Sequence, residues 1–232
     1  KKCVLELGGS DPFIIAESAD LDVAVPMAVT GRVQNNGQSC IAAKRFIVVE
    51  ARAEEFIAKF SEQMNALSVG DPMDPATQVG PLVSAAQRDE IAGQVDDALS
   101  KGAVATAGGA AVDGAGFFYR PTVLTGVTDQ MRAGVEEIFG PVAVVYVVKD
   151  LAEAIELGNA TPWGLGSSVW ATDPAEQTQA IEGLEAGMVF VNAIVASTPE
   201  LPFGGIKRSG YGRELSAMGM REFMNAKTFY VA

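Results

Sequence analysis

Histidine is absent from the 232 residues, and cysteine occurs only twice, as Cys3 and Cys40. The absence of histidine excludes a Ser-His-Asp triad, a Cys-His pair and a histidine-ligated metal within this chain. The two cysteines lie 37 positions apart, which is not the spacing of a zinc site. Two cysteines also make no disulfide scaffold, so we expect a reducing compartment, the cytoplasm.

Positive charge is also scarce, with 17 Lys and Arg against 29 Asp and Glu and a net charge of −12. No run of Lys or Arg exceeds two residues, so we expect no nucleic-acid partner. No apolar run approaches the roughly 18–20 residues that span a bilayer, so we expect no membrane partner. The N-terminal "KKCVLELGG" starts basic, but its apolar run stops at Glu6, which is not typical of a secretory signal.

Phosphate-binding loops are missing too. There is no GxxxxGK[ST] sequence, and "GLGSSV" lacks the third glycine of the dinucleotide fingerprint, so we interpret it as a turn that enters a strand.

The chain does contain short apolar runs, rich in β-branched residues, that alternate with helical patterns. This alternation predicts an α/β fold with an open, largely parallel sheet and flanking helices. The expected strands are 3–7, 12–16, 45–50, 103–107, 118–124, 141–148, 166–171 and 187–192. The expected helices are 20–35, 51–66, 84–100, 151–159, 174–185 and 214–223, with N-caps at Asp20, Ser84, Asp150 and Asp173.

Glu6 stands out because it ends the first strand pattern, just before Gly8 and Gly9. In open α/β sheets the active site lies at the carboxyl ends of the strands, so Glu6 is a candidate working carboxylate. Cys3 alternates with Leu5 and Leu7 on the same strand, and we expect it to be buried. The chain begins with Lys and enters directly on this strand, so we expect a piece of a longer protein.

Cys40 lies in "NNGQSCIAAKRF", where small residues on both sides leave room for a substrate beside the sulfur. A thiolate is a strong nucleophile toward an electrophilic carbonyl. Backbone N–H groups, a bound cationic cofactor or a carboxylate acting through water could each activate it. A lone cysteine is otherwise more often an inert buried residue.

Five collinear segments resemble the C-terminal half of an NAD(P)-dependent aldehyde dehydrogenase, over essentially the whole chain. They are "LELGGSDPFII", "NNGQSCIAAKRF", "EEIFGPV", "NATPWGLGSSVW" and "LPFGGIKRSGYGREL". The resemblance implies that Cys40 is the nucleophile, that Glu6 is the general base 34 residues before it, and that Glu137 and Phe139 hold the nicotinamide end of NAD or NADP. It further implies that Cys40 forms a thiohemiacetal with an aldehyde, which loses a hydride to give a thioester that Glu6 helps water to hydrolyse.

Within the family, the segments around Cys40 and 201–216 most resemble succinate-semialdehyde dehydrogenases. That resemblance implies that Ser197 binds the distal carboxylate of succinate semialdehyde, although a loop serine bonded to its own backbone is an equal alternative.

The resemblance also implies a domain organisation. Residues 1–224 would form the catalytic domain, with 1–8 and about 206–220 bordering a cofactor domain that has no counterpart here, and 225–232 would be a C-terminal oligomerisation strand. The choice between NAD and NADP therefore stays open, and we expect a homo-oligomer only for the full-length enzyme and no activity for this chain alone. Two alternatives remain at this stage: a cysteine-dependent thioester or ester hydrolase, and a non-catalytic fragment that self-associates.

Overall fold

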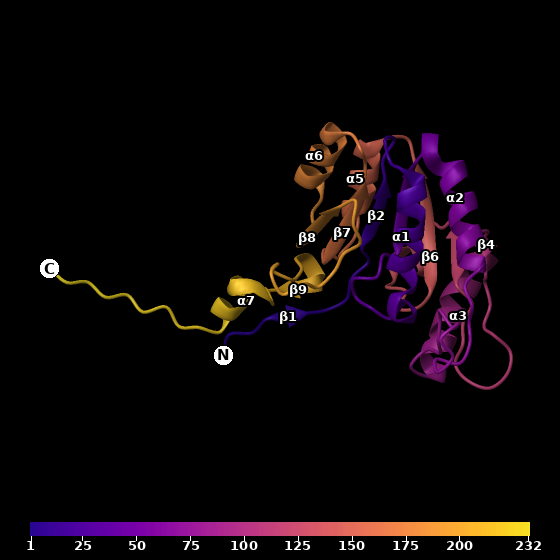
Figure 1. The fold of residues 1–232 in the computed structure, drawn as a ribbon, viewed down its shortest axis with the longest axis horizontal. Helices are drawn as coiled ribbons and strands as arrows, with labels where there is room; N and C mark the ends of the chain where they lie inside the picture. Colours follow the sequence, from indigo (N-terminus) through magenta and orange to yellow (C-terminus); the bar gives the residue numbers. More distant parts are fainter.

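A seven-stranded sheet, covered by helices on both faces, forms the body of the chain (Figure 1). The computed structural model describes residues 1–232. The strand order is β4-β5-β6-β3-β2-β7-β8, and every neighbouring pair is parallel except β4 with β5. The strands are β2 Pro12–Ile15, β3 Arg45–Val49, β4 Val104–Ala107, β5 Thr122–Thr125, β6 Val142–Val148, β7 Gly166–Trp170 and β8 Met188–Val191. The predicted α/β class is confirmed.

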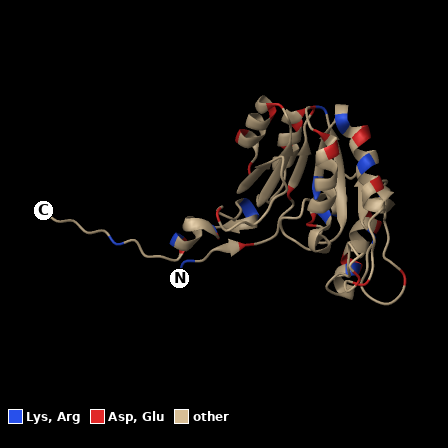
Figure 2. Cartoon of the chain, viewed as in Figure 1, with Lys and Arg blue, Asp and Glu red and all other residues tan.

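The helices divide between the two faces. The longer ones are α1 Leu21–Val33, α2 Glu50–Asn65, α3 Ala85–Ser100, α5 Leu151–Asn159 and α6 Pro174–Gly183, and the short ones are α4 Arg132–Val135, α7 Ser216–Glu222 and the 3-10 turns η1 Gln34–Gly37 and η2 Lys207–Ser209. Helices α1 and α2 pack on one face, and α3 and α5 pack on the other. Figure 2 shows that acidic and basic residues gather on helices and loops, while the strands carry few of them. No helix is both long enough and apolar enough to cross a membrane.

Alternating side chains of the central strands explain how both faces are filled. Phe13 and Phe46 point to the α1–α2 face, whereas Ile14 and Ile47 point to the α5 face, and all four are fully buried. The four expected caps are present, since Asp20, Ser84, Asp150 and Asp173 each accept a hydrogen bond from a backbone N–H of the first helical turn.

The first predicted strand differs from expectation. It shortens to β1 Leu5–Glu6, which lies outside the large sheet and pairs antiparallel with β9 Gly210–Tyr211. Cys3 is exposed, so the expectation that it is buried was wrong. The alternation of Cys3 with Leu5 and Leu7 indicated a buried face, but β1 is too short and too peripheral to be covered on either side.

The C-terminal residues 225–232 begin near the N-terminus and extend away from the body of the chain (Figure 1). They belong to no strand in the single chain, and Phe229, Tyr230 and Val231 are among the most exposed apolar side chains. The oligomerisation role of this segment stays a prediction.

Candidate active site

The candidate site lies at the amino ends of the parallel strands, not at their carboxyl ends. Cys40 and Lys44 lie in the loop that enters β3, Asp11 directly precedes β2, and Phe139 lies just before β6. The expectation of a carboxyl-end site was therefore wrong. The site lies at the amino ends because of the path of the chain. Helix α1 returns across the sheet, and the Cys40 loop joins the end of α1 to the start of β3.

The turn before Cys40 requires its unusual sequence. Asn35 and Asn36 have φ values of 51° and 56°, and Gly37 has a φ of 73°. A Cβ atom on Gly37 would lie 2.3 Å from the Gly140 carbonyl oxygen, so only glycine fits against the loop that carries Phe139. The Asn36 side chain accepts from Gly80 N at 2.8 Å and donates to Pro81 O at 3.1 Å. The "NNG" sequence thus fixes where the Cys40 loop begins.

Cys40 is half-buried and lines an open cleft of about 530 Å³ together with Phe139. The remaining lining residues are Gln34, Asn35, Gln38, Ser39 and Ile41. Burial raises the pKa of the Cys40 thiol above its usual range, the charge of Lys44 opposes this rise, and Asp11 adds to it. In the free chain the thiol is therefore mostly protonated at neutral pH, and the thiolate needs stabilisation from its surroundings.

Lys44 is buried behind the Cys40 loop, with only 2% of its side chain exposed. Its Nζ donates to the carbonyl oxygens of Ser39, Cys40 and Ala42 at 3.2, 2.9 and 3.0 Å. Burial, and next the charge of Arg32, lower the pKa of Lys44 to about 8. Three carbonyls thus replace the water that this ammonium would bind outside the protein.

Glu137 joins this group from the segment before β6. Its Oε1 lies 3.5 Å from Lys44 Nζ and accepts from Gly9 N at 3.1 Å. A Cβ atom on Gly8 would lie 2.4 Å from Glu137 Oε2, so the glycine lets the carboxylate approach the backbone closely. Glu137, Cys40 and Phe139 are thus brought to one side of the sheet.

Glu6 reaches the site from β1. Both of its carboxylate oxygens are shielded from solvent and accept no hydrogen bond from the protein. Burial raises the pKa of Glu6, the nearby Glu214 raises it further, and Arg213 opposes both. Glu6 also lies close enough to Cys40 to raise the pKa of the thiol. A carboxylate whose oxygens are free of hydrogen bonds can accept a proton from water.

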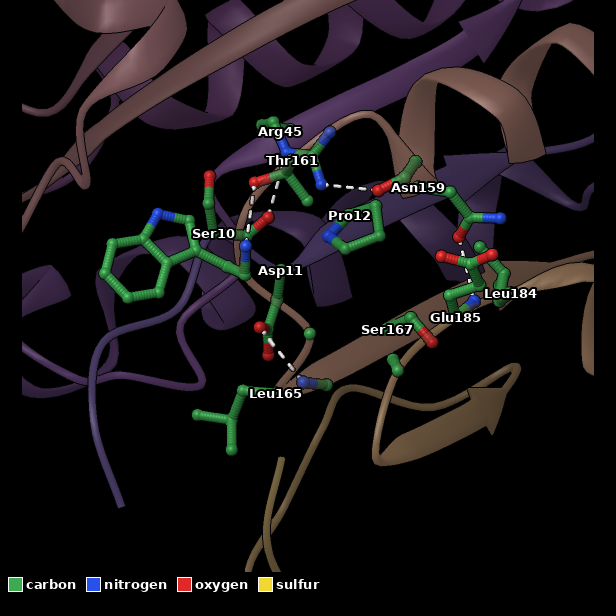
Figure 3. A pocket seen from close by; sticks show the side chains of 15 residues that line it. Ser10, Asp11, Pro12, Arg45, Asn159, Thr161, Leu165, Ser167, Leu184 and Glu185 are labelled. Carbon is green, nitrogen blue, oxygen red and sulfur yellow. Dashed lines mark hydrogen bonds between the residues drawn. The ribbon is translucent and has the colours of Figure 1, made fainter. Parts of the chain in front are cut away.

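A buried acid, Asp11, and a buried arginine, Arg45, line a second pocket, which Figure 3 shows. Asp11 Oδ1 accepts from Gly166 N at 3.1 Å, and burial raises the Asp11 pKa to about 6 against the opposing charge of Lys44. Arg45 donates to the carbonyls of Ser10 and Gly158 at 2.9 and 2.8 Å, which ties the start of β2 to the end of α5. These contacts hold the amino ends of β2, β3 and β7 together.

Ser197 lies in the loop after β8, where its side chain is exposed and makes no hydrogen bond. It is not among the residues that line the Cys40 cleft. The neighbouring Thr198 differs, because its hydroxyl is shielded and has no hydrogen-bond partner. The role predicted for Ser197 stays a prediction.

Sequence reasoning missed Lys44, Asp11 and Ser209. Ser209 Oγ donates to Gly8 O at 2.7 Å and accepts from Gly164 N at 3.0 Å, which fastens the Glu6 segment to the body. A usable signal existed for Lys44 and Asp11, because each is a charged residue directly before a buried strand. No local pattern marked Ser209.

Comparison with protein families matches residues 1–229 to the aldehyde dehydrogenase family. The chain belongs to this family. The succinate-semialdehyde dehydrogenase [NADP(+)] 1 of Mycobacterium ulcerans (strain Agy99) is 62% identical over 231 residues, which cover 100% of this chain and 50% of that protein. The succinate-semialdehyde dehydrogenase [NADP(+)] of Mycobacterium avium (strain 104) is 60% identical over 231 residues, which are 100% of this chain and 49% of that protein.

Solved structures of aldehyde dehydrogenases share the fold. The succinic semialdehyde dehydrogenase from Streptococcus pyogenes, in complex with NADP+, superposes with a TM-score of 0.94 at 40% identity, covering 98% of this chain and 50% of that one. The NAD+ complex of an aldehyde dehydrogenase from Bacillus cereus gives a TM-score of 0.94 at 37% identity, covering 98% and 46%. The chain thus spans about half the length of the relatives it matches.

Proposed function

We propose that this chain is the catalytic half of an NAD(P)-dependent aldehyde dehydrogenase that oxidises succinate semialdehyde to the acid. The observation that carries the proposal is one cleft lined by both Cys40 and Phe139, with the charge of Glu6 acting on the Cys40 thiol. Family membership supports the reaction class, and the relatives named as NADP-dependent succinate-semialdehyde dehydrogenases support the substrate and NADP. We further propose that the complete enzyme is a cytoplasmic homo-oligomer.

The residues fit the nicotinamide end of such a cofactor. Phe139 offers an apolar aromatic surface in the same cleft as Cys40. Glu137, two residues before it, is a carboxylate that can accept hydrogen bonds from ribose hydroxyls. When bound, the nicotinamide supplies a hydride acceptor. The fit supports a site for this end of the cofactor only, so the choice between NAD and NADP rests on the names of the relatives.

The chain's own residues divide the remaining chemistry. The Cys40 thiolate forms a bond to the aldehyde carbon, and the carbonyl oxygen gains the negative charge. The Cys40 N–H makes no hydrogen bond to the protein and can donate to this oxygen. After the hydride has left, Glu6 accepts a proton from water while the water oxygen bonds to the thioester carbon and the C–S bond breaks.

The cleft lining bears on the substrate. It includes no Lys or Arg, so a distal carboxylate in this cleft would depend on neutral donors such as Gln34 and Asn35. Ser197 and Thr198 lie on a neighbouring loop and are further neutral donors. We therefore propose that hydrogen bonds from these neutral donors recognise the carboxylate.

The test is reduction of the nicotinamide by the full-length protein that contains this chain. With succinate semialdehyde, the wild type and a Cys3→Ser control should both form NADPH, and Cys40→Ala should form none above background. Release of acid from a thioester without any need for a nicotinamide cofactor would favour a hydrolase instead. Activity that survives Cys40→Ala would remove the proposed nucleophile.

A further inference from the structure

The carbonyls that meet at Lys44 also fix the opposite side of the Cys40 loop. The oxygens of Ser39 and Cys40 both point to Nζ, and no peptide bond in the chain is cis. In a trans peptide the N–H points away from the C=O of the same peptide unit. The N–H groups of Cys40 and Ile41 therefore point away from the ammonium.

Those two N–H groups lie on the side of the loop opposite the ammonium. The Cys40 N–H donates to no acceptor of the protein, and the Ile41 N–H bonds to the Cys40 sulfur, which lowers the thiol pKa. The third carbonyl, that of Ala42, belongs to the peptide whose N–H on Ala43 donates to Gly31 O in α1 at 3.0 Å. One buried ammonium thus turns two amides away from itself, one of which bonds to the thiol, and anchors the loop by a third.

We propose, resting on the function proposed above, that Lys44 is a positioning residue that holds the Cys40 and Ile41 amides toward the thiolate and the oxyanion. Its location distinguishes it from a simple core contact. The ammonium uses all three protons on the loop that carries the nucleophile, and its only ion pair is with Glu137, the proposed ribose ligand.

The charge of Lys44 adds to this orientation. It opposes the rise in the Cys40 pKa that burial causes, whereas Asp11 and Glu6 add to the rise. The charged groups that act on Lys44 itself are Arg32, which lowers its pKa, and Asp11 and Glu137, which raise it. Removal of the ammonium should therefore leave the thiolate with two nearby acids and less well aligned amides.

The test measures the alkylation rate of Cys40 against pH in the full-length protein without cofactor, with the label mapped to peptides. Cys3 is the internal reference, because it is exposed in this chain. In Lys44→Gln the Cys40 rate at pH 7 should fall on the order of ten-fold relative to Cys3, as its profile moves to higher pH. Lys59→Gln, which removes a surface ion pair with Asp22 and Glu55, should match wild type.

Lys44→Met is the second variant, since an apolar side chain of similar length leaves all three carbonyls without a donor. It should slow the alkylation of Cys40 at least as much as Lys44→Gln does. A folded Lys44→Gln or Lys44→Met protein with the wild-type profile would overturn the proposal, because lost stability alone does not move a thiol profile. In the same proteins kcat should fall by a larger factor than the factor by which the KM for aldehyde changes. If wild type reduces no nicotinamide with any aldehyde, the proposed function fails, and the alkylation profiles still decide the role of Lys44.

Discussion

Replacement of Glu6 by Gln tests the division of labour between the two proposed catalytic groups. The amide is nearly isosteric but cannot take a proton from water, so thioester hydrolysis should slow by roughly 10²–10⁴-fold, the usual contribution of a general base. The attack by Cys40 does not need Glu6. A single-turnover experiment on the full-length protein should therefore show a normal burst of reduced nicotinamide followed by a slow steady state.

The pH dependence follows from the raised pKa of Glu6. Burial and Glu214 shift it upward, so the base is protonated, and hydrolysis is lost, at a higher pH than for an exposed glutamate. The effect of pH on stability has the opposite sign to that of an acid whose pKa is lowered by an ion pair. A raised folded pKa means that Glu6 stabilises the fold when protonated and that this contribution disappears as pH rises through the folded pKa. Glu6→Gln should therefore raise the melting temperature at neutral pH but not in acid.

The matched control is Glu17→Gln, which changes an exposed glutamate in the turn after β2. It should leave the burst, the steady state and the melting temperature unchanged. Loss of the burst in Glu6→Gln, with hydrolysis at the wild-type rate, would refute the assignment of the base.

Three further predictions concern stability, substrate and association. Gly37→Ala should lower the free energy of unfolding by about 1–3 kcal/mol, because its left-handed φ and its contact with Gly140 both oppose a Cβ; denaturant titration checks this. Ser197→Ala should weaken transition-state binding of succinate semialdehyde by roughly 1.5–3 kcal/mol, but not that of an uncharged aldehyde of similar length; equal kcat/KM losses would remove Ser197 from the site. Phe229→Ser combined with Val231→Ser should reduce self-association in light scattering, whereas an Ala226→Ser control should not.

Most of the large sheet follows from local patterns in the sequence. The strands that became β2, β3 and β6 are continuous apolar runs, as expected for strands buried on both faces, and their predicted bounds differ from the observed ones by a residue or two. The four helix caps were visible because a capping side chain bonds within its own first turn. Local signals were sufficient wherever the deciding contact lay within one turn or one strand.

Contacts between distant segments decided the rest. The pairing of β1 with β9 joins residues about 200 positions apart, and no feature of "CVLEL" shows that its partner is a glycine-rich loop and not the large sheet. The placement of Glu6 and the exposure of Cys3 both follow from that pairing. The location of the site at the amino ends of the strands likewise depends on the route of the chain from α1 to β3, which residue types do not encode locally.

The missing histidine and the buried Lys44 have a common explanation. A nucleophilic thiol needs positive potential nearby, and in this chain no imidazole can supply it. An ammonium at the start of a buried strand is costly to desolvate unless its protons are all bonded, and the carbonyls of Ser39, Cys40 and Ala42 meet that need. Those carbonyls belong to the loop that carries the thiol, so the contacts that offset burial of the charge also direct two amides at the reacting atoms. A neutral side chain at position 44 could fill the space, but it would bring neither the charge nor the orientation.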